Sequence, residues 1–186
     1  YATLSTEAYK GQVYYTTNVD QPTIKSYLYE SPIEINSSVT IKAATVVNSE
    51  LKSVVPAEQQ FALHKAIGKK VNYTHPISRY YMADGPNSLT DGIKGTTAIN
   101  KFWHGIAAKD LIATIDLEEE KNIQLLSLGC LQNYNDWIMM PEWVKFEVSL
   151  DGIHFTLVET VANTVSTNDK SAQIKNFTAS FSSMKA

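Results

Sequence analysis

Residues 143–150 (Trp-Val-Lys-Phe-Glu-Val-Ser-Leu) alternate apolar and polar side chains and then meet the pair Asp151-Gly152. Successive side chains of a strand point to opposite faces, so this alternation predicts a strand with one buried face. Asp-Gly is a strong signal for a hairpin turn, and we expect residues 154–158 to form the partner strand. No segment of the 186-residue chain keeps an apolar repeat of 3.6 residues over three turns. The fold is therefore predicted to be all-β.

Further strand signals occur along the whole chain. β-branched and aromatic runs or alternating patterns predict strands at residues 12–17, 39–47, 59–63 and 113–117. Residues 123–131 form a nearly continuous apolar run, which is typical of a strand covered on both faces. Strands at this spacing favour sandwiches. The charged stretch 64–70, which contains Gly68, predicts a boundary between a domain at 1–64 and a domain at 65–186.

Composition excludes several classes of function. The net charge is −3, so the chain lacks the basic field that would hold nucleic acid or an anionic membrane. Arg79 is the only arginine, which excludes a multi-arginine anion site, and Cys130 is the only cysteine, which excludes an internal disulfide or a cysteine-based zinc site. Cys130 lies in an apolar run and is expected to be a buried small hydrophobe. No stretch reaches the roughly 18 apolar residues of a membrane helix.

The sequence also offers no recognisable catalytic constellation. It contains neither a nucleophile elbow nor a glycine-rich phosphate loop. The acidic residues form no compact pair of the kind that glycoside hydrolysis requires. We therefore expect that this chain is not itself an enzyme.

Two features remain as candidate binding sites. The loop 87–96 combines Asp91, a hydroxyl five residues later and two glycines, a pattern that can wrap Ca²⁺ with oxygen ligands. The alternative is an Asp-Gly turn in which Asp91 caps backbone amides. Aromatic residues in loops suit a glycan, because flat rings stack on the apolar faces of sugars; the candidates are Tyr80, Tyr81, Trp103, Tyr134 and Trp137. For Trp103, and for Trp143, a core or hinge role is the favoured interpretation.

The first part of the chain resembles a known family. Residues 12–22 (Gln-Val-Tyr-Tyr-Thr-Thr-Asn-Val-Asp-Gln-Pro), the segment Tyr29–Ile35 and the segment Val39–Thr45 are similar to the chitobiase/β-hexosaminidase C-terminal domain. The resemblance covers about the first 62 residues and departs from the family where Asn18-Val19 replaces the usual Asp-Gly turn. It implies a small immunoglobulin-like sandwich with no catalytic role.

The second part resembles another family, the discoidin-like (coagulation-factor type C, family-32 carbohydrate-binding) domain. The resemblance spans residues 73–158 and is carried by Leu89-Thr90-Asp91-Gly92, Trp103-x-Gly105, Thr114–Leu117, Val144–Ser149 and Asp151-Gly152. It implies a jelly-roll sandwich and a calcium site at Ser88, Asp91, Ile93 and Thr96. The closing strands usual in that family are not visible, so we expect either truncation at the C-terminus or divergent last strands.

Domains of these two kinds in this order resemble the C-terminal region of bacterial family-20 β-N-acetylhexosaminidases. The resemblance implies a non-catalytic accessory fragment that binds a GlcNAc- or galactose-containing glycan or packs against an upstream catalytic barrel, with calcium as the one expected cofactor. Residues expected to contact the glycan are Tyr80, His104, Asn133, Tyr134 and Trp137. The expected location is the periplasm, the cell surface or the medium, and a start at Tyr1 suggests processing or excision. The alternative is a structural spacer or interaction module without sugar affinity.

Overall fold

The computed structural model describes residues 1–53, 55–99 and 101–186. The chain forms two compact units: unit 1 comprises Tyr1–His64 with Gly92–Lys94, and unit 2 comprises Lys65–Asp91 with Gly95–Ala186. In the described residues there is no helix of the length and apolar character that a membrane crossing requires.

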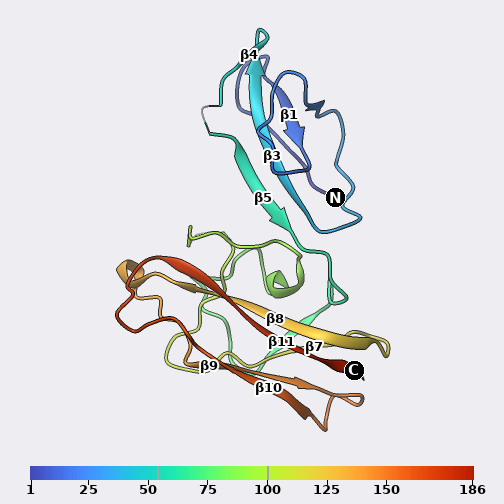
Figure 1. The fold of residues 1–186 in the computed structure, drawn as a ribbon, viewed down its shortest axis with the longest axis vertical. Helices are drawn as coiled ribbons and strands as arrows, with labels where there is room; N and C mark the ends of the chain where they lie inside the picture. Colours follow the sequence, from blue (N-terminus) through green and yellow to red (C-terminus); the bar gives the residue numbers. More distant parts are fainter. Residues whose placement is uncertain (54, 100) are drawn as a thin grey trace. The chain divides into compact units, whose positions relative to one another are not determined.

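Unit 1 is built on one antiparallel sheet (Figure 1). Its strands are β1 (Gln12–Thr16), β2 (Tyr27–Leu28), β3 (Val39–Val47), β4 (Glu50–Leu51) and β5 (Ala57–Phe61). β1 lies between β2 and β3, and β4 and β5 also pair with β3. Phe61 forms a bridge with Ile93, and Gly92–Lys94 thereby joins this unit.

Both faces of the unit 1 sheet are partly covered. Ile41 of β3 is buried on one face, and Ala44 and Val46 are buried on the other. The chain before β1 is fixed by two backbone hydrogen bonds between Ala2 and Ile33, of 2.8 and 2.9 Å. The short apolar core is therefore closed by loops and by the N-terminal segment as well as by strands.

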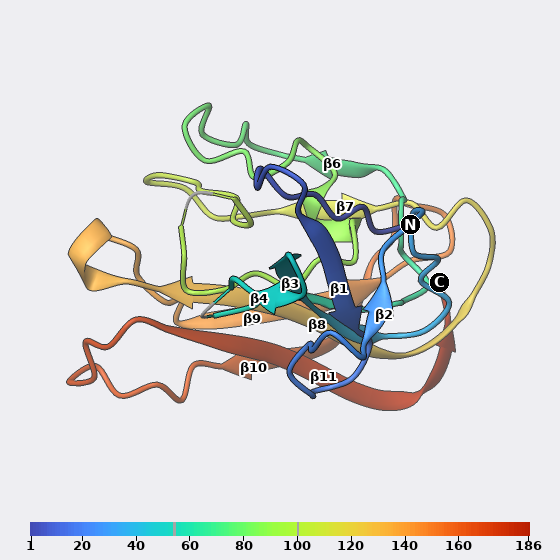
Figure 2. The same ribbon diagram turned by 90° about the horizontal axis from the view of Figure 1, so that it is seen from above.

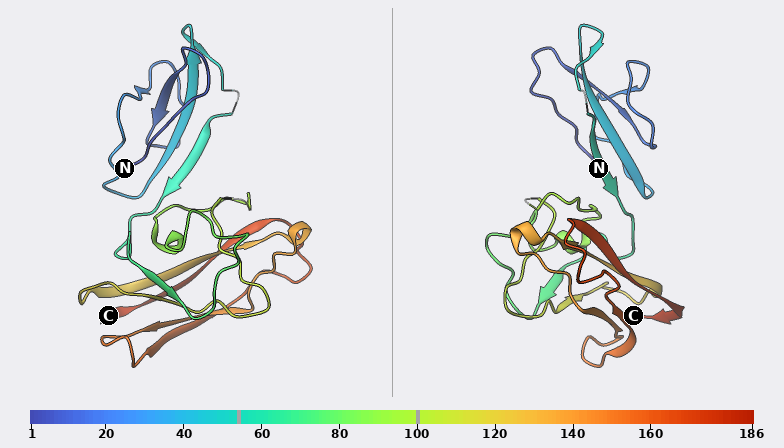
Figure 3. Two further views of the ribbon diagram at one scale, coloured as in Figure 1. Left: turned by 180° about the vertical axis from the view of Figure 1, so that it is seen from behind. Right: turned by 60° about the vertical axis from the view of Figure 1, so that its left-hand side comes forward.

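Unit 2 consists of three antiparallel strand pairs (Figures 2 and 3). The strands are β6 (Val71–Tyr73), β7 (Ala113–Ile115), β8 (Asn122–Gln132), β9 (Trp143–Val148), β10 (Thr156–Ala162) and β11 (Gln173–Lys185). β6 pairs with β7, β8 with β11, and β9 with β10, and β11 also contacts β9 and β10. Two 3₁₀ turns, η1 (Ser88–Thr90) and η2 (Tyr134–Asp136), lie in the connections.

The core of unit 2 is centred on β11. Phe177 and Ala179 have no exposed surface, and Val148 of β9 and Leu131 of β8 are also buried. Phe177 faces Leu128 in the register of β11 and β8. This packing of strand pairs against one another confirms the all-β prediction and its sandwich-like sheets.

The structure corrects three details of the predicted strands. The run 123–131 is not covered on both faces: Leu125 is 57% exposed and Ser127 is also exposed, because the outward face of β8 carries little cover there. The turn at Asp151-Gly152 is part of the longer connection 149–155, so the partner strand begins at Thr156 instead of His154. The short strand expected at 59–63 lies at 57–61, where its residues pair with β3.

Candidate functional site

A closed loop at the end of β8 carries three of the expected glycan contacts. Residues 133–138, here called the Trp137 loop, are closed by backbone hydrogen bonds of 2.9 and 3.0 Å between Asn133 and Ile138. The Asn133 side chain accepts a hydrogen bond from the Asn135 amide and donates one of 2.6 Å to the Asp136 carboxylate. Asn residues favour such turns because their side chains bond to nearby backbone groups. Hydrogen bonds within residues 133–138 therefore close this loop locally.

Trp137 is the most exposed large aromatic residue of unit 2. Its side chain is 85% exposed, and its backbone is left-handed, with φ 58° and ψ 30°. A bulky residue in this conformation costs about 1–3 kcal/mol and persists only where its surroundings impose it. The Trp137 amide donates to the Tyr134 carbonyl at 3.3 Å, which helps to hold the turn. The loop thus presents an indole ring to solvent at the expense of backbone strain.

The loop between β10 and β11 supports the Trp137 loop. Gln132 is only 2% exposed, and its side-chain amide donates to the carbonyls of Asp169 and Ser171 at 2.9 and 3.1 Å. The Lys170 ammonium lies 4.0 Å from the centre of the Tyr134 ring, a cation–π distance, and donates to the Thr167 carbonyl. One face of Tyr134 is therefore already occupied by Lys170.

Tyr80 and His104 belong to a different part of unit 2. Tyr80 is 72% exposed and accepts a hydrogen bond of 2.6 Å from the Arg79 guanidinium. His104 forms a bridge with Met82, which brings it beside the loop that carries Tyr80. Within the described parts of the chain, no hydrogen bond or ring contact joins Tyr80 or His104 to the Trp137 loop.

The imidazole of His104 is engaged within the protein. Its Nδ1 lies 2.9 Å from the Tyr73 hydroxyl, and its Nε2 lies 2.9 Å from the Gly85 carbonyl and 3.1 Å from the Met82 carbonyl. Burial raises the pKa of Tyr73 to about 12. A glycan contact at His104 stays a prediction, and it would require one of these hydrogen bonds to be exchanged.

The four positions of the expected calcium site are divided between the units. Ser88, Asp91 and Thr96 belong to unit 2, whereas Ile93 belongs to unit 1. The Ser88 hydroxyl donates to the Gly85 carbonyl at 2.9 Å, and Gly92 has φ 78°, as a turn glycine does. Among the described residues, no group of three or more His, Cys, Asp or Glu side chains is placed to hold a metal ion. Calcium binding stays a prediction from the resemblance.

The other two tryptophans have unlike surroundings. Trp103 is half-buried and its indole N–H donates to the Thr96 carbonyl at 2.8 Å, which confirms the structural interpretation. Trp143 is 52% exposed at the start of β9, so of its two expected roles, core or hinge, the core role is wrong and the hinge role stays a prediction. Its side chain belongs to the outward-facing set of β9, which alternates with the inward-facing Val144.

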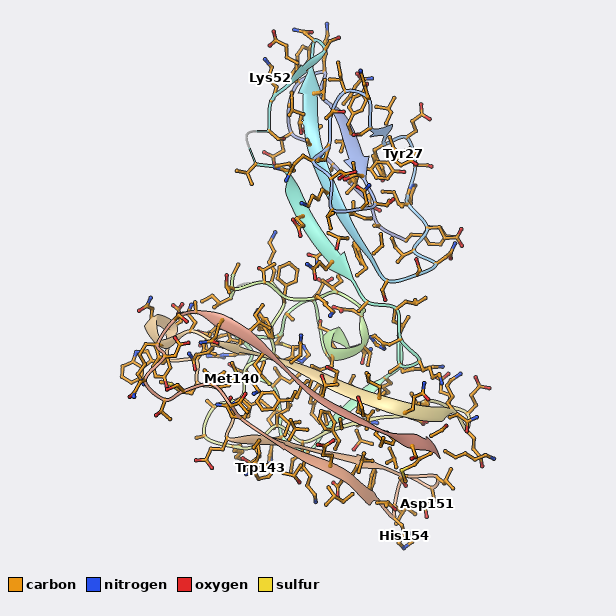
Figure 4. The ribbon with its side chains drawn as sticks, in the orientation of Figure 1. Tyr27, Lys52, Met140, Trp143, Asp151 and His154 are labelled. Carbon is orange, nitrogen blue, oxygen red and sulfur yellow. The ribbon has the colours of Figure 1, made fainter. Side chains whose placement is uncertain are left out.

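The connection after β9 carries an exposed hydrogen-bonded pair, Asp151 and His154 (Figure 4). The Asp151 carboxylate lies 2.7 Å from Nδ1 of His154 and accepts backbone hydrogen bonds from Ile153 and His154. The His154 side chain and these amides hold the pKa of Asp151 far below its usual range. The Ser149 hydroxyl donates to Asp151 and does not point to His154, so the three residues organise the turn and do not form a nucleophilic triad.

Sequence reasoning missed three residues at the Trp137 loop. Lys170 contacts Tyr134, and Gln132 bonds to Asp169. Each contact joins residues more than thirty positions apart and depends on the register of β8 and β11. Met139 adjoins the loop and is 48% exposed, but methionine beside an apolar run carries no signal of exposure. The polar composition of residues 162–172 was the only sequence signal that this segment is a surface loop.

Comparison with known proteins bears on unit 1. Residues 1–57 match the family model described as the chitobiase/β-hexosaminidase C-terminal domain. No curated protein shows significant similarity to the chain. The match lies wholly within unit 1, and the discoidin-like resemblance of the second part stays a prediction. Residues 1–57 therefore correspond to a chitobiase/β-hexosaminidase C-terminal domain.

Proposed function

We propose that this chain is a non-catalytic accessory region of a glycoside hydrolase of the β-N-acetylhexosaminidase class. The support is the family match of residues 1–57 together with a sequence that offers no compact carboxylate pair. In this proposal the chemistry belongs to a catalytic barrel elsewhere in the parent protein, which acts outside the cytoplasm. Unit 2, with its discoidin-like sequence pattern, supplies contact with a GlcNAc- or galactose-containing glycan.

The exposed indole of Trp137 is the observation that carries the glycan contact. A Trp side chain that is 85% exposed in a strained backbone conformation has a large apolar face ready for a sugar ring. The neighbouring Asp136 carboxylate is exposed and can accept further hydrogen bonds from sugar hydroxyls. Stacking and hydrogen bonding from one rigid loop would orient a terminal sugar residue.

Isothermal titration of the full chain with GlcNAc, chitobiose and lactose tests this proposal. We expect heat with at least one of the three sugars, and Trp137→Ala should weaken that binding about two- to tenfold, as the loss of one aromatic stacking contact does. The matched control is Ile153→Ala, since Ile153 is 76% exposed in the loop at the other end of β9. Equal weakening by both variants would contradict a role for the Trp137 loop.

A structural spacer is the second candidate function. Several side chains outside the Trp137 loop are exposed and apolar, among them Trp143 and Leu157 on β9 and β10. Such a surface can pack against another part of a larger protein. Flat heats with all three sugars, with folding intact by circular dichroism, would favour the spacer.

The proposed calcium site is tested separately by thermal unfolding. A ligand that binds only the folded state raises the unfolding midpoint, so added Ca²⁺ should raise it and a chelator should reverse the shift. Asp91→Asn should abolish the calcium-dependent rise of the unfolding midpoint. An unchanged midpoint at millimolar Ca²⁺ would contradict the site.

A further inference from the structure

Unit 1 contains a hollow that lies wholly within the segment matched by the family model. Its volume is about 430 Å³, and its polar and aromatic lining comes from Ser5, Thr6, Gln12, Tyr29 and Glu30. This volume lies inside the range of roughly 300–1,000 Å³ that small-molecule sites occupy. All lining residues lie in residues 4–30, before the end of the match at residue 57.

The walls of the hollow are fixed by hydrogen bonds of unit 1. On one side, the Thr6 hydroxyl accepts from the Thr45 hydroxyl of β3 at 3.0 Å and from the Ala8 amide at 3.2 Å. On the other side, the Tyr29 amide donates to the Val13 carbonyl at 2.8 Å, which holds the end of β2 against β1. The hollow is therefore preformed, so a ligand would bind without ordering a loop.

Gly11, one of the lining residues of the hollow, allows the chain to approach β3 closely. A Cβ atom at Gly11 would lie 2.9 Å from the Ala8 carbonyl and 3.1 Å from a methyl carbon of Thr45. Only glycine fits such an approach without a shift of the backbone. Thr6 and Gln12, which precede and follow Gly11 in the chain, both line the hollow.

The polar groups of the lining have unused hydrogen-bonding capacity. Thr6 accepts twice through its oxygen, which leaves its own proton free to donate outward. In the described structure, the side chains of Ser5, Gln12 and Glu30 form no hydrogen bond or ion pair with the protein. Together they offer hydroxyl, amide and carboxylate groups, which match the alternating donors and acceptors of sugar hydroxyls.

An aromatic cluster adjoins these polar groups. Tyr29 contacts Tyr15 edge-to-face at 6.5 Å between ring centres, and Tyr15 also contacts Tyr27 at 5.6 Å. Tyr27 is 65% exposed at the surface of the unit (Figure 4). Tyrosine rings supply apolar faces for pyranose rings, and Tyr29 is one of the residues that line the hollow.

We infer that this hollow of unit 1 is a saccharide site, separate from the Trp137 loop, that takes a neutral sugar residue. Glu30 is the only charged residue of the lining, so the site carries a negative charge and no cation. That charge disfavours uronic acids and sulfated sugars, and it accepts hydrogen bonds from neutral sugars. Unit 1 therefore contributes its own contact to a glycan.

Amide chemical shifts of the full chain, observed by NMR during titration with GlcNAc, chitobiose and glucuronic acid, test this inference. We expect the two neutral sugars to shift amides of residues 4–6, 11–13 and 28–30, and glucuronic acid to shift them much less. The same chemical-shift changes should persist in Trp137→Ala. Absence of sugar binding at the Trp137 loop is thereby distinguished from absence of sugar binding at the hollow.

Two variants of equal size sharpen the test. Glu30→Gln should weaken binding of the neutral sugar at the hollow about threefold to tenfold, because a charge-assisted hydrogen bond becomes a neutral one. Glu34→Gln, which changes an exposed carboxylate outside the lining, should leave binding unchanged. The inference is overturned if no amide around the hollow shifts with either neutral sugar, if glucuronic acid binds as well as GlcNAc, or if the two variants behave alike.

Discussion

Unit 2 holds two tryptophans whose surroundings differ in almost every respect. Trp103 is half-buried and its indole N–H is bonded to the Thr96 carbonyl, whereas Trp137 is 85% exposed. The Trp103 ring also lies against two glycines: a Cβ at Gly95 would come within 2.6 Å of it, and one at Gly129 within 3.9 Å. Gly95 therefore makes room for one indole, while backbone strain holds the other in solvent.

The difference separates a structural tryptophan from one available to a ligand. The indole N–H of Trp103 is hydrogen-bonded, and its ring lies against the protein backbone. These contacts stabilise the fold. Trp137 contributes little packing and holds a left-handed conformation that a simpler turn residue would adopt at less cost. A residue that costs stability and gains little packing is a good candidate for a binding role.

The largest expected effect is the difference in stability between the variants Trp103→Ala and Trp137→Ala. Trp103→Ala should lower the free energy of unfolding by about 3 kcal/mol, because it leaves a cavity between the Gly95 segment and β8. Trp137→Ala should change it by no more than about 0.5 kcal/mol, as exposed substitutions do. Urea unfolding followed by circular dichroism measures both. Comparable losses in the two variants would contradict the distinction between the sites.

A smaller loss is expected when the space beside Trp103 is filled. In Gly95→Ala the new methyl group would meet two ring atoms of Trp103 at 2.6 and 2.7 Å, and the ring is held by its bond to Thr96. Overpacking of this kind costs about 1–3 kcal/mol. Double substitution with Trp103→Ala should remove most of the added cost, because the obstructing ring is gone. If the two effects simply add in urea unfolding, the proposed steric conflict is absent.

The fold of the chain was largely predictable from local patterns. The β-branched run at 39–47 forms a strand with the expected bounds, and the alternation at 143–150 forms a strand that ends two residues early, at Val148; side-chain period and β-propensity act within a few residues. The burial of the outward face of β8 was not predictable. Whether Leu125 is buried depends on which segments lie over the strand, and the apolar run alone does not specify that.

The loop that holds three of the candidate residues was predictable from the sequence, whereas the grouping of all five was not. Asn133, Tyr134 and Trp137 are neighbours in sequence and form one loop, so proximity along the chain was enough to bring them together. Tyr80 and His104 were grouped with them because aromatic and imidazole groups suit a glycan, and that chemistry carries no information on distance. Contacts such as Lys170 with Tyr134 follow from strand register, which a pattern of residue types does not fix.

Comparison of Trp137→Gly with Trp137→Ala separates the effect of backbone strain on stability from the effect of the indole on the proposed sugar binding. Glycine adopts a positive φ without penalty, so Trp137→Gly should be more stable than Trp137→Ala by about 1 kcal/mol. Both variants should lose the sugar binding proposed for the loop to the same degree. The measurement is paired urea unfolding and sugar titration; equal stability of the two variants would show that the left-handed backbone stores no strain.

The smallest expected effect concerns Cys130, which reports on opening of β8 beneath Trp103. Burial raises the pKa of the thiol to about 11, so at pH 8 only about one thiol in a thousand is ionised, and labelling by a disulfide reagent should be slow. Cys130 follows Gly129 in the strand and faces the other way, so Trp103 affects it only through the stability of β8.

Trp103→Ala should therefore speed the labelling of Cys130, because local opening of the strand costs less once the covering ring is removed. Trp137→Ala should label at the rate of the unsubstituted chain, since its loop lies beyond the end of β8 and contributes little packing. Labelling of each chain in concentrated urea gives the rate for the exposed thiol. The labelling rates of the three folded chains are normalised by this rate. If Trp137→Ala accelerates labelling as much as Trp103→Ala does, the exposed indole stabilises β8 after all, and the separation between a tryptophan that stabilises the fold and one that is available to a ligand fails.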